Sequence, residues 1–215
     1  MADVFITGGT GYIGVRVIAR LLERGHQVRA LARAGSERKL PAGCTPILGN
    51  ALDRATYSHH ISGADSIVHL VGVSHPNPSK AAQFRSIDLV AGQEAINAAA
   101  ERGVGHFVYL SVGQPAPVMK AYVAVRAECE NLIQQKRLNA TILRPWYVLG
   151  PGHRWPYALL PMYWILGKLP VTRDGARRLG LVTLAQMVAA LVNAIENPCQ
   201  GVRILDVPAI RYASA

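Results

Sequence analysis

Glycine is concentrated in one short stretch near the N-terminus, T-G-G-T-G-Y-I-G at residues 7–14, where four of eight positions are glycine. Apolar residues 4–6 precede this stretch as a short strand, and Ile13, Val17 and Leu21 follow with the spacing of one helix face. Glycine is needed where the backbone takes a positive φ, or where a neighbouring chain or a phosphate comes too close for a Cβ. A strand, a glycine loop and a helix N-terminus in this order predict a site for the pyrophosphate of a dinucleotide.

The glycines of this loop fit two spacings. Gly9, Gly11 and Gly14 match G-x-G-x-x-G, whereas Gly8, Gly11 and Gly14 match G-x-x-G-x-x-G. Both spacings are typical of dinucleotide loops, so these residues alone leave the register open. The alternative is a tight strand-to-helix turn without a ligand, but so many glycines are entropically unfavourable when nothing binds there.

The rest of the chain alternates strand patterns with helix patterns. After the first strand, strands are expected at residues 26–33, 45–48, 66–73, 106–110, 140–143 and 202–207. Helices are expected from residue 13 to Gly25 and at residues 88–102, 122–135 and 184–195. This alternation predicts an α/β fold with a Rossmann-type doubly wound parallel sheet. We expect one domain over residues 1–215, with a cofactor-binding core at 1–144 and a small C-terminal substrate region at 145–215.

The composition indicates a globular chain, because 50% of the residues are apolar and 17% are charged. Cys44, Cys129 and Cys199 are widely spaced and form no C-x-x-C pair, which suits reduced thiols and a cytoplasmic location. The net charge of +10 is either a basic surface without a specific partner or an attraction to anions, such as a phosphorylated cofactor or lipid.

Several classes of site and segment have no pattern in this sequence. It shows no zinc-finger or helix-turn-helix spacing, so no nucleic acid partner is expected. The histidines do not fall at metal-ligating spacings, so no metal site is expected. The N-terminal residues do not read as a signal peptide, and no apolar run is long enough to predict a membrane span.

Three segments downstream of the glycine loop carry further distinctive residues: Gly49-Asn50-Ala51-Leu52-Asp53, Tyr109-Leu110-Ser111-Val112 and Leu143-Arg144-Pro145. Together with T-G-G-T-G-Y-I-G, they resemble the short-chain dehydrogenases/reductases in their extended and atypical branches. The loop is similar to T-G-x-x-G-x-x-G, which selects the register with Gly8. The first segment is similar to G-D-x-x-D with Asn50 in place of the acid, and the last matches L-R-P.

Within that superfamily the chain is most similar to NAD(P)H-binding, NmrA-like members, a group of reductases, epimerase-like proteins and nucleotide sensors without catalysis. The resemblance implies a set of cofactor-binding residues in the glycine loop, after the third strand and at the end of the fourth. These are Thr7, Gly8, Gly9, Thr10, Gly11, Tyr12, Ile13, Gly14, Asn50, Ala51, Leu52, Val71 and Gly72.

The end of the second strand bears on which dinucleotide binds. NAD sites usually place an acidic residue there to bind the ribose 2′-hydroxyl, but this sequence has Arg33 and no acid. A guanidinium binds a 2′-phosphate through charge-assisted hydrogen bonds, so NADP(H) is favoured over NAD(H). The candidates for a second contact with this phosphate are Arg16, Ser36, Arg38 and Lys39. The alternative is that Arg33 is a solvated residue at the end of a strand.

A candidate catalytic set follows the fifth strand. In the family that the chain resembles, a tyrosine exchanges a proton with the substrate oxygen, a lysine four residues later supports it, and a serine orients the substrate. Ser111, Tyr122 and Arg126 stand in these places, with arginine where the family has lysine. Arginine keeps its charge but shuttles no proton. The alternative is that Tyr122 only borders a pocket and Arg126 pairs with Glu130 one turn later.

Aromatic residues crowd the segment after the sixth strand. The resemblance implies that this segment builds the substrate pocket, with Trp146, Tyr147, His153, Arg154 and Trp155 as candidates. Aromatic walls with a few polar groups suit a small, largely apolar substrate. Residues 155–170 also combine Trp and Tyr with aliphatic side chains, which is typical of peripheral membrane contact, or of a helix packed on the sheet.

Two functions of different classes are compatible with this sequence. The first is an NADP(H)-dependent oxidoreductase or epimerase-like enzyme that acts on a small-molecule substrate. The second is a catalytically silent NADP(H)-sensing or scaffold protein, because Arg126 departs from the family pattern.

Overall fold

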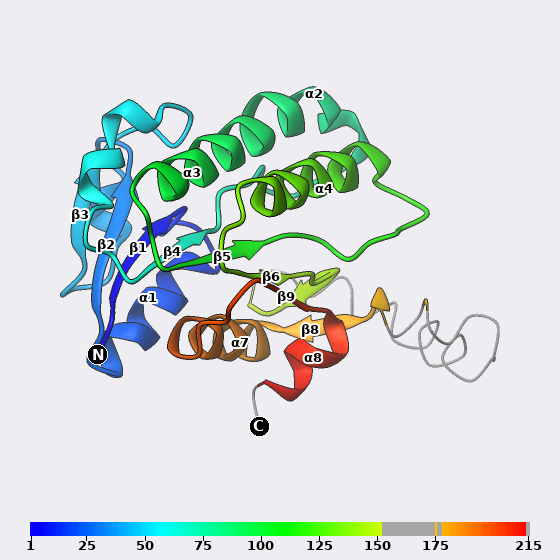
Figure 1. The fold of residues 1–215 in the computed structure, drawn as a ribbon. Coiled ribbons are helices and arrows are strands. Elements are labelled where there is room, and N and C mark those ends of the chain that lie inside the picture. Colours follow the sequence, from blue (N-terminus) through cyan, green and yellow to red (C-terminus); the bar gives the residue numbers. More distant parts are fainter. Residues whose placement is uncertain (152–174, 176–177, 214–215) are drawn as a thin grey trace.

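The computed structural model describes residues 1–151, 175 and 178–213 of the chain. Its centre is a seven-stranded parallel sheet in the order β3-β2-β1-β4-β5-β6-β9 (Figure 1). In chain order these strands are β1 (Asp3–Thr7), β2 (Gln27–Ala32), β3 (Thr45–Leu48), β4 (Ser66–His69), β5 (His106–Leu110), β6 (Ala140–Leu143) and β9 (Val202–Leu205). The expected doubly wound parallel sheet is confirmed.

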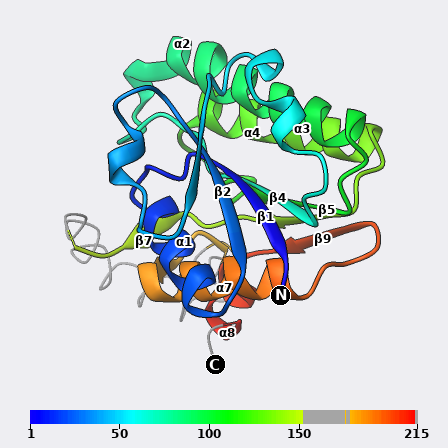
Figure 2. The ribbon, with the colours of Figure 1, turned by 90° about the vertical axis from the view of Figure 1, so that its left-hand side faces the viewer.

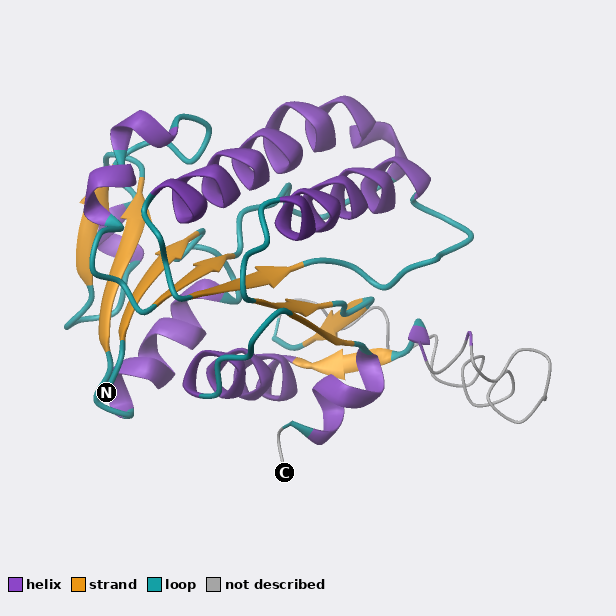
Figure 3. Cartoon of the chain, in the orientation of Figure 1, coloured by secondary structure: helices purple, strands orange, loops and turns teal. Residues whose placement is uncertain are grey.

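Two groups of helices cover the two faces of this sheet, so the strands form the middle of three layers (Figures 2 and 3). The first group is α2 (Ala81–Gln83), α3 (Val90–Glu101) and α4 (Lys120–Gln135), and a π-helical stretch η5 (Phe84–Leu89) joins α2 to α3. The second group is α1 (Gly14–Glu23), α7 (Leu184–Glu196) and α8 (Val207–Tyr212). Short 3₁₀ helices are η1 (Glu37–Lys39), η2 (Arg54–Thr56), η3 (Ser58–His60) and η4 (Pro78–Lys80).

Side chains along each strand point alternately to the two faces of the sheet, and each face has its own apolar core. In β1, Phe5 faces the core under α3 and α4, whereas Val4 and Ile6 face the core over α1 and α7. All three side chains are fully buried. Successive strand residues point to opposite faces, so a continuous apolar run is what a strand covered on both sides requires.

The order of the strands reverses beside β1. Thr7, the last residue of β1, is paired with Leu31 of β2 on one side and with His69 of β4 on the other. In doubly wound sheets, ligands bind in the crevice that such a reversal opens at the carboxyl ends of the strands. The glycine loop begins at Gly8, directly above this point.

The fourth strand is shorter than the sequence pattern indicates, because it ends at His69 instead of residue 73. Beyond His69 the backbone bonds to buried side chains. The carbonyl of Val71 accepts from Arg126, and the N–H of Val73 donates to Asp88. Apolar residues alone did not distinguish a strand from a segment that is held by side chains.

Other boundaries also differ from the predicted ones. The helix expected at residues 88–102 is preceded by helical turns that begin at Pro78. The last strand ends at Leu205, and Asp206 then caps α8 by accepting the N–H of Ala209 at 3.1 Å. A two-stranded parallel sheet, β7 (Tyr147–Leu149) with β8 (Leu181–Thr183), was not expected, because each strand has only three residues.

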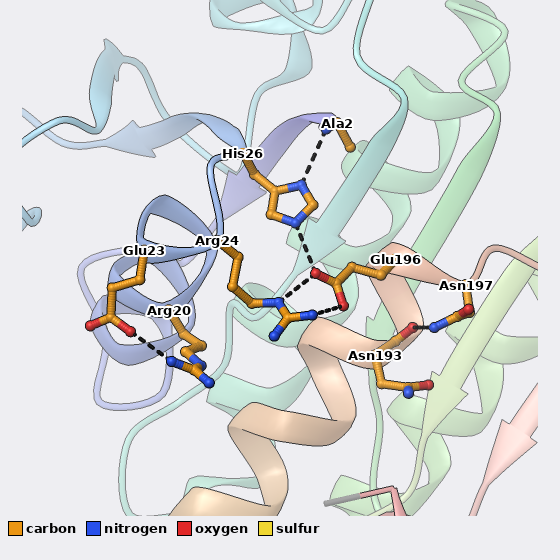
Figure 4. Close-up of polar contacts among 8 residues, drawn as sticks. All are labelled: Ala2, Arg20, Glu23, Arg24, His26, Asn193, Glu196 and Asn197. Carbon is orange, nitrogen blue, oxygen red and sulfur yellow. Dashed lines mark hydrogen bonds and ion pairs between the residues drawn. The ribbon is translucent and has the colours of Figure 1, made fainter.

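A polar clip joins the end of α1 to the end of α7, at the edge of the sheet away from the glycine loop (Figure 4). Arg24 donates two hydrogen bonds to Glu196, at 2.6 and 2.8 Å, and His26 Nε2 lies 3.0 Å from the same carboxylate. His26 Nδ1 accepts the N–H of Ala2 at 3.2 Å. The hydrogen bonds from Arg24 hold the pKa of Glu196 below its usual value.

Candidate functional site

The glycine loop is closely packed against the end of β4. Gly8 has a φ of +79°, and a Cβ there would lie 2.7 Å from the carbonyl carbon of Leu70 and 2.8 Å from the nitrogen of Val71. A Cβ at Gly14 would collide with the carbonyl oxygen of Gly8. Since backbone atoms cannot move aside, this geometry favours the register with Gly8 and Gly14. Gly9 is tight as well, because a Cβ there would lie 2.9 Å from Ile18 Cδ1.

A cavity of about 420 Å³ opens beside this loop, at the carboxyl ends of β1, β2 and β4; we call it the loop cavity. The predicted cofactor-binding residues that line it are Gly8, Thr10, Gly11, Arg33, Asn50, Ala51, Leu52, Val71 and Gly72. Sequence reasoning missed further lining residues: Leu31, Ala32, Gly49, Leu70, Val73, Ser74, Gln83 and Ile87. Glycines and aliphatic side chains therefore form much of its wall.

The turn after β3 forms one wall of the loop cavity. Asn50 Oδ1 accepts the N–H of Leu52 at 3.0 Å, and the N–H of Asn50 donates to Thr56 Oγ1 at 3.0 Å. Asn50 therefore shapes the turn through its side chain, as asparagine commonly does.

Arg33 lies exposed at the mouth of the loop cavity, directly after β2. Among the residues that the structure describes, no carboxylate pairs with its guanidinium. Arg16 is engaged elsewhere, because its Nη1 donates to the carbonyl oxygen of Tyr12 at 2.7 Å and its guanidinium lies 4.6 Å from the Tyr12 ring centre. It lines a groove between α1 and α7 and not the loop cavity.

Thr7 faces away from the loop cavity. Its Oγ1 lies 2.8 Å from Nδ1 of His69, and both side chains are fully buried. Burial, together with the charge of Arg126, lowers the pKa of His69 to about 3, so the imidazole is neutral. Thr7 thus fixes the ends of β1 and β4 under the glycine loop.

A second cavity, of about 480 Å³, lies on the other side of the glycine loop; we call it the tyrosine cavity. It brings together the predicted catalytic residues Ser111, Tyr122 and Arg126 with Trp146 and Tyr147. The remaining lining residues are Tyr12, Ile13, His75, Pro76, Asn77, Leu110, Val112, Pro145 and Val148. The predicted pocket residues His153, Arg154 and Trp155, and the segment 155–170, lie outside the described residues.

Arg126 is almost fully buried in the floor between the two cavities. Its Nη2 donates to Asp88 Oδ1 at 2.5 Å and to the carbonyl oxygen of Val71 at 3.3 Å, and its Nη1 donates to the carbonyl oxygen of Leu110 at 3.1 Å. A Cβ at Gly72 would lie 2.5 Å from Arg126 Nη2, so glycine makes room for the guanidinium.

Asp88 balances the charge of Arg126 from the π-helical stretch. Its side chain is fully buried, and its Oδ2 accepts the N–H of Val73 at 3.0 Å. Burial raises the pKa of Asp88, whereas the charge of Arg126 and the hydrogen bond from Val73 lower it. No role in the site was expected for Asp88. Nothing local in the sequence indicates that this helical aspartate contacts an arginine 38 residues later.

Tyr122 stands half-buried at the start of α4, between Phe84 and Arg126. Its ring centre lies 4.9 Å from that of Phe84 and 5.2 Å from Cζ of Arg126. The arginine therefore places a positive charge against the ring face of the tyrosine, within the range of a cation–π interaction.

Ser111 is tied to a second buried carboxylate. Its Oγ donates to Glu130 Oε1 at 2.5 Å, and Gln114 Nε2 donates to the same oxygen at 2.7 Å. Arg144 forms a two-point contact with Glu130, through Nε at 3.1 Å and through Nη2 to the other oxygen. Glu130 therefore pairs with Arg144 and Arg126 with Asp88, instead of with each other.

A family model described as NAD(P)H-binding matches residues 8–156 of the chain. The chain belongs to this NAD(P)H-binding family. The matched residues include the glycine loop, the turn after β3 and the segment from Ser111 to Arg126. Membership agrees with the resemblance to short-chain dehydrogenases/reductases.

Two curated relatives are reductases by name. The chain is 26% identical to the 4-hydroxy-2-methyl-3-oxo-4-farnesyl-3,4-dihydroquinoline-1-oxide ketoreductase of Stigmatella aurantiaca, over 68% of this chain and 50% of the relative. It is 25% identical to the 2-alkyl-3-oxoalkanoate reductase of Stenotrophomonas maltophilia (strain K279a), over 92% of this chain and 66% of the relative. The chain thus spans half of the first relative and less than two thirds of the second.

Solved structures share the fold. The Bordetella bronchiseptica enzyme WbmH, solved with NAD⁺, superposes with a TM-score of 0.71 at 23% identity, over 96% of this chain and 76% of that one. The UDP-glucose 4-epimerase of Thermotoga maritima, solved with UDP-glucose, has a TM-score of 0.68 at 18% identity, over 95% and 76% of the two chains. The chain therefore shares its fold with these two structures.

The part of the chain that the structure describes contains neither a membrane-spanning helix nor a metal-binding cluster. No helix there has the length and apolar character needed to cross a membrane. No group of three or more His, Cys, Asp or Glu side chains there is arranged to hold a metal ion.

Proposed function

We propose that the chain is an NADP(H)-dependent oxidoreductase or epimerase-like enzyme that acts on a small, largely apolar alcohol or the corresponding ketone. The observation that carries this proposal is the tyrosine cavity, where Ser111, Tyr122 and Arg126 meet two aromatic side chains beside the glycine loop. The names of the two reductase relatives support a carbonyl group as the reacting group.

The residues around the glycine loop fit a dinucleotide. Gly8 lines the loop cavity and has no Cβ, so a ligand in the cavity can approach its backbone closely. Helix α1 begins at Gly14, and the N-terminus of a helix favours the binding of a pyrophosphate. Asn50 and Leu52 would border the adenine, and Arg33 would hold the 2′-phosphate. Tyr12 and Ile13, which line the tyrosine cavity, would border the nicotinamide end.

In the proposed reaction, Tyr122 exchanges a proton with the substrate oxygen. When bound, NADP(H) supplies or accepts the hydride at the nicotinamide C4. Ser111 orients the substrate oxygen, and Trp146 and Tyr147 cover the apolar part of the substrate and exclude water. Arg126 keeps a fixed positive charge against the ring of Tyr122 and holds this ring in the cavity.

The test is the variant Tyr122→Phe, with Tyr212→Phe as the control, since Tyr212 is exposed at the end of α8. Loss of the hydroxyl removes the proton carrier, so NADPH oxidation with a ketone substrate should fall by about 10²- to 10⁴-fold. The dissociation constant for NADPH, measured by fluorescence, should stay within about twofold. Unchanged turnover in Tyr122→Phe would remove Tyr122 from the mechanism.

The preference for NADP(H) rests on Arg33, which is exposed and without an acidic partner among the described residues. Arg33→Ala should weaken NADPH binding by about 10- to 100-fold and leave NADH binding unchanged, because only NADPH carries the 2′-phosphate. Arg102→Ala is the control, since this exposed arginine follows α3 and does not line the loop cavity. Equal or tighter binding of NADH by the native protein would contradict the preference.

One observation favours the second candidate, an NADP(H) sensor without catalysis. Both terminal nitrogens of Arg126 already donate to protein groups, with Asp88 as the charged partner. Arg126→Lys separates the two functions. Turnover that appears only in this variant would indicate a silent native site, whereas native turnover indicates an enzyme.

A further inference from the structure

Ser111 is the residue of the tyrosine cavity whose hydrogen-bonding direction the structure fixes. It follows β5, is 3% exposed, and gives its hydroxyl proton to Glu130 Oε1 at 2.5 Å. A serine hydroxyl has one proton and two lone pairs. While that proton is held by Glu130, only lone pairs remain on Oγ for any other contact.

Glu130 cannot reverse this direction by giving a proton back to Ser111. Its side chain is 5% exposed, and one charged partner, Arg144, donates to both of its oxygens. Gln114 adds a further donor at 2.7 Å. Both oxygens of Glu130 thus serve as acceptors for three donating side chains, and this geometry directs the Ser111 proton toward Glu130.

The nearby cation does not supply the missing donor. Arg126 lines the same cavity, but its Nη2 donates to Asp88 and Val71, and its Nη1 donates to Leu110 and Tyr109. Its Nε has no hydrogen-bond partner among the described residues, but this atom is fully buried and therefore out of reach of a substrate in the cavity. Tyr122 is then the hydroxyl of the candidate catalytic set whose proton remains for the substrate.

We propose that Ser111 acts toward the substrate as a hydrogen-bond acceptor, and that the tyrosine cavity therefore selects the alcohol over the matching ketone. Glu130 is the positioning residue that sets this polarity. The inference rests on the proposed function, because it concerns the same substrate oxygen. An alcohol donates to Ser111 and accepts from Tyr122, whereas a ketone oxygen accepts from Tyr122 and meets a lone pair at Ser111.

The experiment uses α-tetralol and α-tetralone as the matched probes, because they differ only at the oxygen. Both are titrated by calorimetry onto the full chain saturated with tetrahydro-NADP, a redox-inactive analogue of NADPH, so that no reaction occurs. The alcohol should bind about tenfold more tightly than the ketone, since the ketone leaves the Ser111 acceptor unsatisfied.

Three variants assign this ratio to the Ser111–Glu130 contact. Glu130→Met frees the hydroxyl proton, so the ratio should fall to about one through tighter ketone binding. Ser111→Ala should also bring it to about one, through weaker alcohol binding. Glu128→Met, an exposed position on the same helix, should keep the native ratio.

A purely structural role for Glu130 would weaken both probes equally and leave the ratio unchanged, which would overturn the proposal. A native ratio of one or less, binding of neither probe, or an unchanged ratio in Ser111→Ala would overturn it too. If tetrahydro-NADP does not bind, the proposed function fails together with this inference. If ketone turnover occurs with a native ratio of one, only this inference fails.

Discussion

The loop cavity and the tyrosine cavity lie on two sides of the same glycine loop, yet they are built differently. The loop cavity is walled by backbone, glycines and the turn at Asn50, whose hydrogen bonds join residues at most six positions apart. The tyrosine cavity rests on two buried ion pairs, Arg126 with Asp88 and Arg144 with Glu130, which join residues 38 and 14 positions apart.

This difference shows where the specificity of each cavity comes from. A backbone cradle has a fixed shape, and a change of one side chain outside it leaves the cradle intact. A buried ion pair depends on two partners at once, because removal of one leaves an uncompensated charge in a low-dielectric site. The two cavities should therefore respond to substitution in different ways.

The largest effect is expected at the buried ion pair of the tyrosine cavity. Asp88→Ala leaves the guanidinium of Arg126 buried without its charged partner, so the free energy of unfolding should fall by about 3–5 kcal/mol. Urea denaturation measures this change. Glu23→Ala is the control, because the exposed pair of Glu23 with Arg20 should contribute at most about 0.5 kcal/mol. Equal losses of unfolding free energy in the two variants would show that the buried Arg126–Asp88 pair contributes no more to stability than an exposed pair.

A smaller loss is expected at the backbone cradle of the loop cavity. Gly8→Ala combines a positive φ with contacts to the backbone of Leu70, and should cost about 3 kcal/mol together with NADPH binding. Gly35 has the same φ of +79° but nothing within 4 Å of an added Cβ. Gly35→Ala should therefore cost only about 1 kcal/mol and leave NADPH binding unchanged. Similar costs would mean that the contacts with β4 are relieved by backbone movement.

The smallest effect concerns the histidine beneath both cavities. His69 is neutral when folded, with a pKa of about 3, but takes up a proton near pH 6.5 when unfolded. Stability is therefore complete above that value and should fall by about 2 kcal/mol from His69 alone as the pH drops from about 7 to 5. Burial also lowers the pKa of His106, to about 4, so this residue adds to the fall.

Urea denaturation at several pH values tests this dependence. His69→Gln should show a shallower fall than the native protein, because position 69 no longer takes up a proton on unfolding. His59→Gln, a change at an exposed position, should follow the native curve. A His69→Gln curve parallel to the native one would contradict the role of His69.

Prediction from the sequence succeeded where the signal is local. The alternation of strands and helices predicted the parallel sheet, which the structure confirms. The glycine spacing alone left the loop register open, and the family resemblance selected the register with Gly8, which the packing against Leu70 favours. Ser111, Tyr122 and Arg126 line one cavity, and their catalytic roles stay a prediction.

Prediction failed where a distant side chain decides. The end of β4 at His69 depends on Arg126 and Asp88, which bond to the backbone at Val71 and Val73. One alternative paired Glu130 with Arg126, one helical turn earlier. Helical spacing cannot show that Arg144, directly after β6, contacts Glu130 instead. The start of α8 did have a local signal, Asp206 followed by Val207-Pro208, which is typical of a capped helix start.

The short sheet of β7 and β8 has a consequence for how such a chain can change over evolutionary time. The chain leaves the tyrosine cavity at Leu149 and returns beside it at Leu181, and parallel pairing holds the point of departure next to the point of return. The clip of Arg24, His26 and Glu196 anchors α7 independently. Each doubling of the length between two such fixed points costs only about 0.6 kcal/mol. A change in the number of residues between these two points should therefore leave the sheet and its glycine loop in place.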